Sequence, residues 1–217
     1  MISNRDFASL RILAYNLRYY RDQKGLTQEA VAVATKLSQR TYQTLENGDG
    51  NPSLKTLSRL AEFYGVMVSR VLSLSVIKLR HDQPVFEAKL KKTFIDQDLG
   101  CLIRSFEGVA LWGNRLIAQF ANHDVTKTPL DLFSIKSSLP KDILTAQLMA
   151  EKAGIIQPYL NSNLGPNGAT LYFRIYPTLI FPARGAKPIY SVTYLVPVEK
   201  DTEKNYMRFC DLLLNCI

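Results

Sequence analysis

The stretch SQRTYQTLENGDGNPS, residues 38–53, places hydroxyl and amide side chains between two apolar parts of the chain. Ser38 is a suitable first residue for a helix, because its hydroxyl can accept a hydrogen bond from a backbone amide of the first turn. The glycines and the proline of NGDGNP end such a helix near Asn47. Tyr42 and Leu45 share one face, so the polar side chains around them point outward. The pattern predicts a short helix that exposes polar groups.

Four further short helices surround this segment. Apolar residues recur at three- and four-residue spacing from Phe7 to Lys24, and a glycine follows. Thr27 can cap a second helix, QEAVAVA. Beyond the loop, SLKTLSRLAEFYG predicts a helix that ends at Gly65, and a last turn covers about Ser69 to Leu74. The sequence therefore predicts an all-α five-helix unit over residues 1–75.

Three motifs of this unit follow one another at the spacing of a known domain. They are LRYYRDQKGLTQEAVA, LSQRTYQTLENG and NPSLKTLSRLAEFYGV. Over residues 8–74 the chain resembles the helix-turn-helix domain of phage lambda repressor, Cro and the bacterial Xre-type regulators. The resemblance implies that the helix starting near Ser38 enters the major groove of double-stranded DNA, with its first residues against base edges.

The exposed side chains of this helix are of the types that contact DNA. Arginine can bind guanine with two hydrogen bonds, amides pair with adenine, and threonine meets a phosphate or a thymine methyl group. Which side chain meets which base stays open. By resemblance, Gln28 and Asn47 contact phosphates, with capping as the alternative, and Lys36 either reaches a phosphate or stays solvated. The predicted DNA-binding residues are Gln28, Lys36, Ser38, Gln39, Arg40, Thr41, Gln43, Thr44 and Asn47.

Two charged residues match a structural ion pair of this family. The resemblance implies that Arg21 and Glu46 tie the first helix to the end of the recognition helix, and the loss of either would leave a poorly compensated charge. Lys36 and Tyr42 depart from the family pattern, which has glycine in the turn and an aliphatic residue in the helix. A left-handed Lys36 would cost about 1 kcal/mol.

The second half of the chain is predicted to contain strands as well as helices. Residues 76–103 are predicted to form a helical linker that packs on its own domain or against a second copy. Its apolar residues at helical spacing are Phe86, Leu90, Phe94 and Leu102. Farther on, GVALWG and RLIAQFA predict strands, while PLDLF and PKDILTAQLMAEKAG predict helices. Three longer strands, IIQPYLNS, ATLYFRIYPTLIF and PIYSVTYLVPVEK, and a closing helix, NYMRFCDLLLNCI, complete the chain.

This order predicts an α+β domain with an antiparallel sheet over residues 104–217, and hence a multidomain protein. The order of elements resembles a PAS sensor domain, with a GAF-like or other α+β sensor as the alternative. Such a domain would hold a small apolar or aromatic ligand between its sheet and helices. The candidate lining residues, each of which would otherwise belong to the core, are Trp112, Phe120, Phe133, Leu148, Tyr172, Arg174, Tyr176 and Tyr194.

Composition limits the class of protein. The chain has 217 residues, 47% of them hydrophobic and 21% charged, which suits a soluble protein with two domains. The formal net charge of +8 suits a polyanionic partner, and residues 1–75 carry ten lysines and arginines against six aspartates and glutamates. Neither a signal peptide nor a membrane-spanning run is found, so we expect a cytoplasmic protein without a membrane partner.

Patterns for catalysis, metal binding and cofactors are missing from the sequence. His81 and His123 lack flanking ligand patterns, and neither HExxH nor GxSxG nor a P-loop occurs. The cysteines Cys101, Cys210 and Cys216 form no CxxC pair and are expected to be reduced. The segment Gly-Asp-Ser-Met that marks a self-cleaving repressor is also missing. We therefore expect no enzyme, no cofactor and no metal.

Three functional hypotheses follow. The first is a transcription regulator that binds an inverted repeat as a homodimer, with the second domain sensing a ligand and controlling the dimer. The second is a DNA-binding adaptor whose second domain only dimerises or binds a protein. The third, an enzyme tethered to DNA, would need a catalytic grouping that the sequence does not show.

Overall fold

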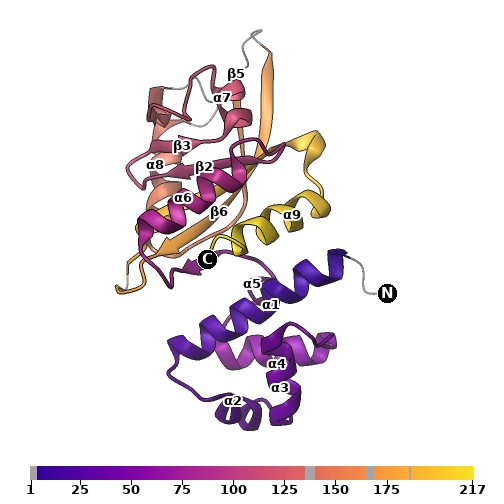
Figure 1. The fold of residues 1–217 in the computed structure, drawn as a ribbon. Coiled ribbons are helices and arrows are strands. Elements are labelled where there is room, and N and C mark those ends of the chain that lie inside the picture. The colour runs from indigo at the N-terminus through magenta and orange to yellow at the C-terminus, as the bar shows by residue number, and fades with distance from the viewer. Residues whose placement is uncertain (1–3, 135–139, 165–168, 186) are drawn as a thin grey trace. The chain divides into compact units, whose positions relative to one another are not determined.

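A computed structural model describes residues 4–134, 140–164, 169–185 and 187–217. It divides the chain into two compact units, Met1–Leu74 and Ser75–Ile217 (Figure 1). This division lies one residue before the boundary expected from the sequence. Within the described ranges, no helix is both long and apolar enough to cross a membrane.

In its described residues, the first unit consists of five helices, as the sequence predicts. They are α1 (Asn4–Gln23), α2 (Gln28–Ala34), α3 (Gln39–Asn47), α4 (Leu54–Tyr64) and α5 (Val68–Val71). Thr27, Ser38 and Ser53 begin α2, α3 and α4, and the hydroxyl of each accepts a hydrogen bond from the backbone amide three residues later. Gly48 and Gly65 end α3 and α4 in the left-handed conformation that glycine adopts without strain.

These helices enclose one apolar core. Its buried members are Leu13, Leu17, Val31, Ala32, Tyr42, Leu45, Leu57, Leu60, Ala61, Tyr64 and Val71. A buried amide adds a polar tie, because the Asn16 side chain donates to the backbone carbonyls of Val71 at 2.9 Å and Ser73 at 3.0 Å. The long first helix is thereby bound to the end of the unit by hydrogen bonds from the Asn16 side chain as well as by apolar burial.

The turn between α2 and α3 contains a strained residue. Lys36 has a φ of 54°, in the left-handed region that costs a residue with a side chain about 1–2 kcal/mol. The left-handed conformation, left open for Lys36 from the sequence, is thus the one that it adopts. Hydrogen bonds hold the turn on both sides, since the Thr35 hydroxyl donates to the carbonyl of Val31 at 2.7 Å and the Leu37 amide donates to that of Ala32 at 2.9 Å.

The second unit is built on a mixed sheet. Its described strands are β1 (Val76–Lys78), β2 (Gly100–Arg104), β3 (Val109–Gly113), β4 (Leu130–Asp131), β5 (Tyr159–Leu164), β6 (Thr170–Phe181) and β7 (Tyr190–Pro197). The order is β1-β6-β7-β2-β3-β4, and β5 pairs with the first half of β6. The predicted antiparallel pairs β5–β6 and β6–β7 are confirmed, whereas β1 runs parallel to β6.

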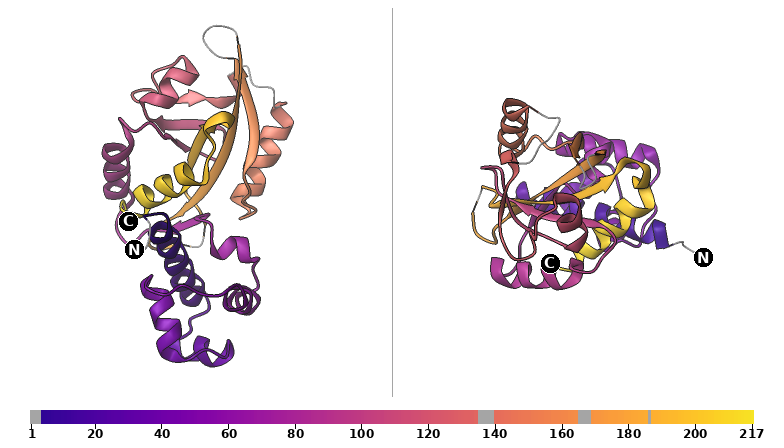
Figure 2. Two further views of the ribbon diagram at one scale, coloured as in Figure 1. Left: turned by 90° about the vertical axis from the view of Figure 1, so that its right-hand side faces the viewer. Right: turned by 90° about the horizontal axis from the view of Figure 1, so that it is seen from above.

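Helices cover both faces of this sheet (Figure 2). They are α6 (Gln83–Phe94), α7 (Arg115–Ala121), α8 (Lys141–Lys152) and α9 (Glu203–Leu214), with 3₁₀ turns η1 (Leu132–Ser134) and η2 (Val198–Lys200). The Phe173 ring lies 5.0 Å from that of Phe120 in α7, and the Tyr194 ring lies 4.9 Å from that of Phe209 in α9. Because side chains alternate along paired strands, we call the two sides the Phe173 face and the Tyr194 face.

A buried polar cluster lies between the Phe173 face and α8. Arg104 and Glu151 are 2% and 0% exposed, and one Arg104 nitrogen donates to both carboxylate oxygens at 2.6 Å. Arg104 also donates to the hydroxyls of Tyr159 at 2.6 Å and Ser191 at 3.1 Å. Polar partners therefore compensate the burial of both charges.

The prediction of a separate helical linker is wrong. Residues 76–103 belong to the second unit, because β1 pairs with β6 and the Phe94 ring of α6 lies 5.2 Å from the Phe209 ring. Leu102 does not extend the helical face, since it lies in β2. At Leu102, pairing with a strand about a hundred positions later in the sequence decides the structure, and the local helical spacing does not.

The secondary structure predicted for two further segments is also wrong. RLIAQFA forms α7 rather than a strand, and PLDLF forms β4 and η1 rather than a helix. The reason for the first lies in Asn114, whose side chain accepts from the Ile117 amide at 3.3 Å and donates to the carbonyls of Phe94 and Leu99. A side chain on Gly113 would meet Ile117 at 2.9 Å. Gly113 and Asn114 therefore begin a closely packed helix and do not form a hairpin turn.

Candidate nucleic-acid interface

The outward side of α3 carries the polar side chains that the sequence singles out. Tyr42 and Leu45 are buried on the inward side. The exposed residues are Gln39, Arg40, Thr41, Gln43 and Asn47, with Thr44 half-buried. An α-helix with its side chains is about 10–12 Å across, which fits the width of about 12 Å of the DNA major groove.

Hydroxyl groups on α3 stabilise the helix itself. The Ser38 hydroxyl accepts from the Thr41 amide at 3.0 Å and lies 2.7 Å from the Thr41 hydroxyl. The Thr44 hydroxyl donates to the carbonyl of Arg40 at 2.8 Å. The longer side chains Gln39, Arg40 and Gln43 are therefore better placed to reach a partner.

A buried carboxylate fixes the other end of α3. Glu46 is 1% exposed, and its Oε1 accepts from Arg21 Nε at 2.7 Å. Its Oε2 accepts from Arg21 Nη2 at 3.2 Å and from Gln28 Nε2 at 2.8 Å. Arg21 also donates to the carbonyl of Leu26 at 3.1 Å. We call Glu46, Arg21 and Gln28 the Glu46 anchor, because these three residues join α3 to α1 and α2.

The pKa of Glu46 shows which effects dominate the anchor. Burial raises this pKa, but hydrogen bonds from Arg21, Gln28 and Tyr42 outweigh burial and hold it below the usual value. The hydrogen bond to Glu46 in turn raises the pKa of Arg21. Both groups therefore remain charged at neutral pH, in agreement with a structural ion pair.

Tyr42 departs from the expected aliphatic residue and has a polar partner. Its hydroxyl lies 2.6 Å from the hydroxyl of Tyr64, and the Tyr64 ring packs 5.5 Å from the Tyr20 ring. Burial raises the pKa of Tyr64 to about 12. This pair was not predicted from the sequence. The available signal was that a buried tyrosine hydroxyl needs a partner.

Gln28 and Asn47 do not cap their helices. Thr27 caps α2 and Gly48 ends α3. Gln28 uses one of its two amide hydrogens to bind Glu46, which leaves a second donor. Asn47 and Lys36 are exposed, at the end of α3 and in the turn before it.

The eight residues predicted to line a ligand cavity do not surround one space. Trp112, Tyr172, Arg174, Tyr176 and Tyr194 lie on the Tyr194 face by strand register. Phe120 packs on the Phe173 face, and α8 buries Leu148. The side chain of Phe133 lies outside the described residues. The prediction failed because α7 and α8, which carry Phe120 and Leu148, pack on the Phe173 face, whereas the predicted strand residues lie on the opposite face, where α9 covers Tyr176 and Tyr194.

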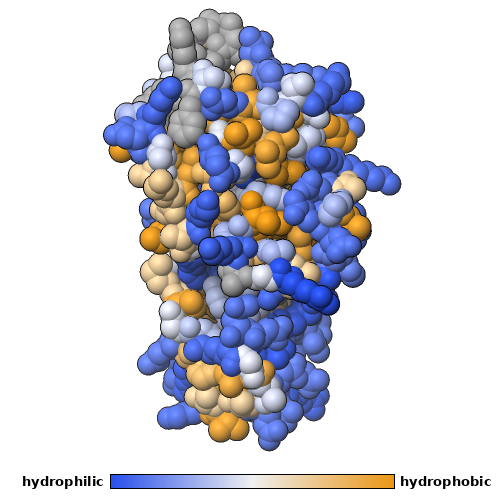
Figure 3. Space-filling view, turned by 90° about the vertical axis from the view of Figure 1, so that its left-hand side faces the viewer, coloured by the Kyte–Doolittle hydropathy of each residue, from blue (hydrophilic) through white to orange (hydrophobic). Residues whose placement is uncertain are grey.

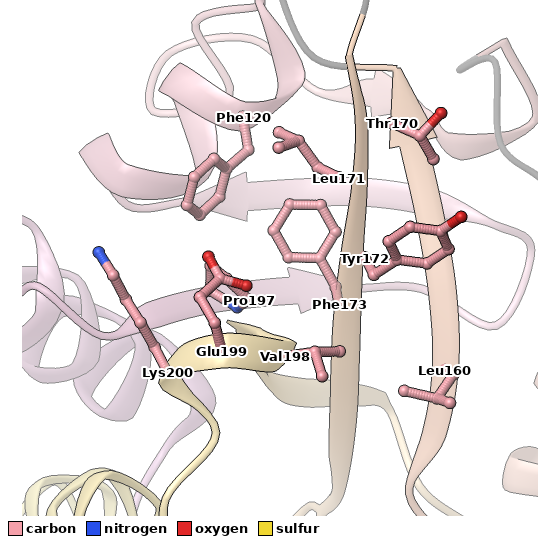
Figure 4. A pocket seen from close by; sticks show the side chains of 10 residues that line it. All are labelled: Phe120, Leu160, Thr170, Leu171, Tyr172, Phe173, Pro197, Val198, Glu199 and Lys200. Atoms are coloured by element: carbon pink, nitrogen blue, oxygen red, sulfur yellow. The ribbon is translucent and has the colours of Figure 1, made fainter.

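The second unit does contain an apolar groove of about 560 Å³ (Figure 4). It is lined by Phe120, Leu160, Thr170, Leu171, Tyr172, Phe173, Pro197, Val198, Glu199 and Lys200. In Figure 4 the Phe120 and Phe173 rings lie on one side of β6, with Glu199 and Lys200 near them, while Tyr172 lies on the other. Two predicted residues, Phe120 and Tyr172, thus contribute to one groove.

Among the residues that the structure describes, no group of three or more histidine, cysteine, aspartate or glutamate side chains could hold a metal ion. All three cysteines are buried and unpaired by disulfides. Burial raises the pKa of Cys101 well above the usual value and that of Cys210 to about 12, which disfavours the reactive thiolate form of these two thiols at neutral pH.

The Glu46 anchor predicts how acid affects the first unit. Glu46→Gln should lower the free energy of unfolding by about 2 kcal/mol at pH 7, because the neutral amide binds Arg21 less strongly. The pKa of Glu46 is depressed in the folded state, so its contribution is present above the unfolded pKa of about 4.3 and is lost as the pH falls through the folded pKa. Urea unfolding of the wild type and of Glu46→Gln at a series of pH values from 7 down to 2 measures this contribution.

The exposed Glu62→Gln on α4 is the matched control and should change stability by less than about 0.5 kcal/mol. The gap between wild type and Glu46→Gln should narrow as the pH falls below about 4. A gap that stays constant from pH 7 to pH 2 would contradict an ionised Glu46 in the anchor.

Comparison with known proteins also identifies a helix-turn-helix in the first unit. The helix-turn-helix family model matches residues 17–68. The repressor RstR of the cryptic phage CTXphi of Vibrio cholerae is 37% identical over 57 residues, which are 26% of this chain and 51% of that protein. The chain thus spans about half the length of this relative.

Two further matches cover different parts of the chain. The second unit is similar to the PAS domain of an HTR-like protein from Haloarcula marismortui, with a TM-score of 0.42 and 10% identity over 52% of this chain and 91% of that one. This similarity assigns no function. The HTH-type transcriptional regulator MJ0272 of Methanocaldococcus jannaschii is 38% identical over 55 residues, which are 25% of this chain and 83% of that protein. Through these residues, the chain belongs to the helix-turn-helix family of transcriptional regulators.

Proposed function

We propose that the protein is a transcription regulator that binds specific sequences of double-stranded DNA through α3. The observation that supports this most directly is the exposure of Gln39, Arg40 and Gln43 on a helix that is fixed at both ends, by the Ser38 cap and by Glu46. A rigid helix binds with less loss of conformational entropy than a mobile one. The excess of basic residues in the first unit favours the approach of DNA.

The proposed contacts divide into two kinds. Arg40 has the guanidinium that binds guanine in the major groove, and the amides of Gln39 and Gln43 suit adenine. Lys36, Asn47 and the second amide hydrogen of Gln28 supply phosphate contacts, which fix the helix in register without reading sequence. Other chemistries have less support, since the described residues offer neither a metal cluster nor a reactive cysteine.

Two copies acting on an inverted repeat fit this mode of binding. One recognition helix reads only a few base pairs, and a two-fold symmetric operator matches a two-fold symmetric dimer. Two such contacts add their binding free energies, which raises specificity above that of one helix.

The second unit is proposed to sense a small apolar or aromatic ligand in the groove lined by Phe120, Phe173 and Val198. The groove has a volume in the range of ligand sites and offers Glu199 and Lys200 as polar groups. A bound ligand alters DNA affinity only if it binds the two states of the dimer unequally. The alternative is an adaptor whose second unit only dimerises or binds a protein.

Replacing Gln39, Arg40 and Gln43 by alanine should weaken binding to a site selected from random duplexes. Each residue that reads a base contributes about 1–3 kcal/mol, and its loss relaxes the preference at one position. Fluorescence anisotropy with selected and scrambled duplexes measures both effects. Arg18→Ala with Gln23→Ala, exposed on α1, is the control of equal charge loss. Unchanged affinity and selectivity in the triple variant would refute the role of α3.

The inverted repeat predicts a dependence on half-site spacing. Inserting about 5 bp, half a helical turn, between the half-sites places them on opposite sides of the duplex and should abolish cooperative binding. An insertion of about 10 bp should restore part of it. Gel-shift titration with a single half-site as reference measures cooperativity. Equal binding at every spacing would count against a two-fold complex.

Ligand sensing predicts a thermal shift for at least one compound in a panel of small aromatic and aliphatic metabolites. Val198→Glu, which puts a charge in the groove, should abolish that shift, whereas Val85→Glu on α6 should keep it. The same compound should change DNA affinity by about 5- to 150-fold. If no compound shifts the wild-type protein, the adaptor hypothesis replaces the sensor.

A further inference from the structure

The helix α8 is apolar on two opposite sides. Leu144 and Leu148 are buried toward the sheet. On the other side Ile143 is 50% exposed and Met149 is 66% exposed. At 100° per residue these two lie on one side of the helix with Ala146 and Ala150 between them. We call Ile143, Ala146, Met149 and Ala150 the outer stripe of α8.

An outward apolar stripe is unusual for a helix that only covers a sheet, because one polar side normally faces water. Ile155, which follows the helix, is a further exposed apolar residue, at 59%. On the side of the molecule that carries α8 in Figure 1, apolar residues lie exposed among charged ones (Figure 3). The outer stripe therefore suits an apolar partner.

The helix α6 is a poorer contact for a second copy, although the sequence suggested it. Its apolar residues Phe86, Leu90 and Phe94 are buried within the second unit. Its exposed side carries Lys89, Lys91 and Lys92. Two such surfaces would bring like charges together, which opposes association.

Charges at the ends of α8 indicate the occupant of the stripe and its direction. Asp142 stands at the first turn and Lys152 at the last, about 15 Å apart along the helix. In an antiparallel pair related by a two-fold axis, Asp142 of each copy lies beside the partner's Lys152. Lys152 now has an exposed contact with Glu107 at 3.4 Å and lies 5.9 Å from the Phe106 ring, and such exposed contacts are weak enough to exchange.

We propose that the outer stripe of α8 is the surface on which a second copy of this chain docks, antiparallel and two-fold symmetric. The small residues Ala146 and Ala150 near the middle allow a close approach of the helix axes, about 8 Å. The surface meets itself, as a two-fold contact requires. The inference rests on the proposed dimer, and it adds the location and direction of the contact.

One helix pair buries less than the roughly 800 Å² per partner of a typical stable interface. The free protein should therefore form a weak dimer, with a dissociation constant in the micromolar range, and an inverted repeat should strengthen it. Sedimentation equilibrium of the full chain measures the constant. Met149→Glu should raise it by about tenfold or more, because a carboxylate would be buried in the contact.

Val85→Glu is the matched control, since Val85 is 51% exposed on α6. It should leave the dissociation constant unchanged within about twofold. Circular dichroism of each variant verifies that the second unit is folded. A dimer that survives Met149→Glu, or that Val85→Glu disrupts equally, would overturn the assignment to α8.

Charge reversal tests the direction of the pair. Asp142→Lys alone should weaken the dimer, and the double variant with Lys152→Asp should recover it, because each reversed charge again meets an opposite one. In a parallel pair identical residues would face each other, so the single and the double variant would dimerise alike. Ala146→Cys, close to the two-fold axis, should also form a disulfide between copies, while Ala88→Cys on α6 should not.

The outcomes separate this inference from the proposed function. If Met149→Glu is monomeric in solution but still binds a single half-site like the wild type, both the α8 contact and DNA binding by α3 stand. If the wild type stays monomeric at high concentration and on an inverted repeat, the α8 proposal falls while DNA binding by α3 does not. If no DNA is bound but the α8 variants act as expected, only the proposed function falls.

Discussion

The ion pair between the buried Glu46 and the half-buried Arg21 is the constraint on which the geometry of α3, the proposed recognition helix, depends. Glu46 lies at the inner side of α3, and its two oxygens bind groups from α1 and α2. A single carboxylate thus fixes the angle of α3 against both neighbours. Its burial would be costly without these donors, so the three helices can adopt few other arrangements. Base reading needs this rigidity, because a bidentate hydrogen bond tolerates little displacement.

The second unit uses its helices differently. Each face of its sheet is covered, the Phe173 face by α7 and α8 and the Tyr194 face by α9 beside α6. The ion pair of Arg104 and Glu151 occupies the space under α8, so no ligand cavity lies there. The proposed binding surfaces of this unit are the groove beside Phe120, for a small apolar ligand, and the outer stripe of α8, for a second copy of the chain.

The sequence predicts elements well where local signals decide them. The Ser38 cap and the glycines after Asn47 define α3, and the alternation in β6 and β7 defines their antiparallel pairing. The sequence does not predict features that depend on residues far away in the chain. The strand β1 has three residues and no signal of its own until β6 pairs with it. Neither Arg104 nor Glu151 carries a local pattern, since 47 positions separate them and only the fold brings them together. The face of the sheet that each helix covers, which separates Phe120 from Tyr176 and Tyr194, is likewise a property of the whole fold.

The most direct test of the central claim replaces single atoms of the DNA. In a selected duplex, 7-deazaguanine or 7-deazaadenine removes the N7 acceptor from the major groove at one position at a time. The account predicts a loss of about 1–3 kcal/mol at specific positions, and the loss of that sensitivity in the alanine variant of the residue that reads it, Gln39, Arg40 or Gln43. If binding instead responds only to removal of the minor-groove amino group of guanine, or if all three variants keep the wild-type sensitivity, α3 does not read the DNA.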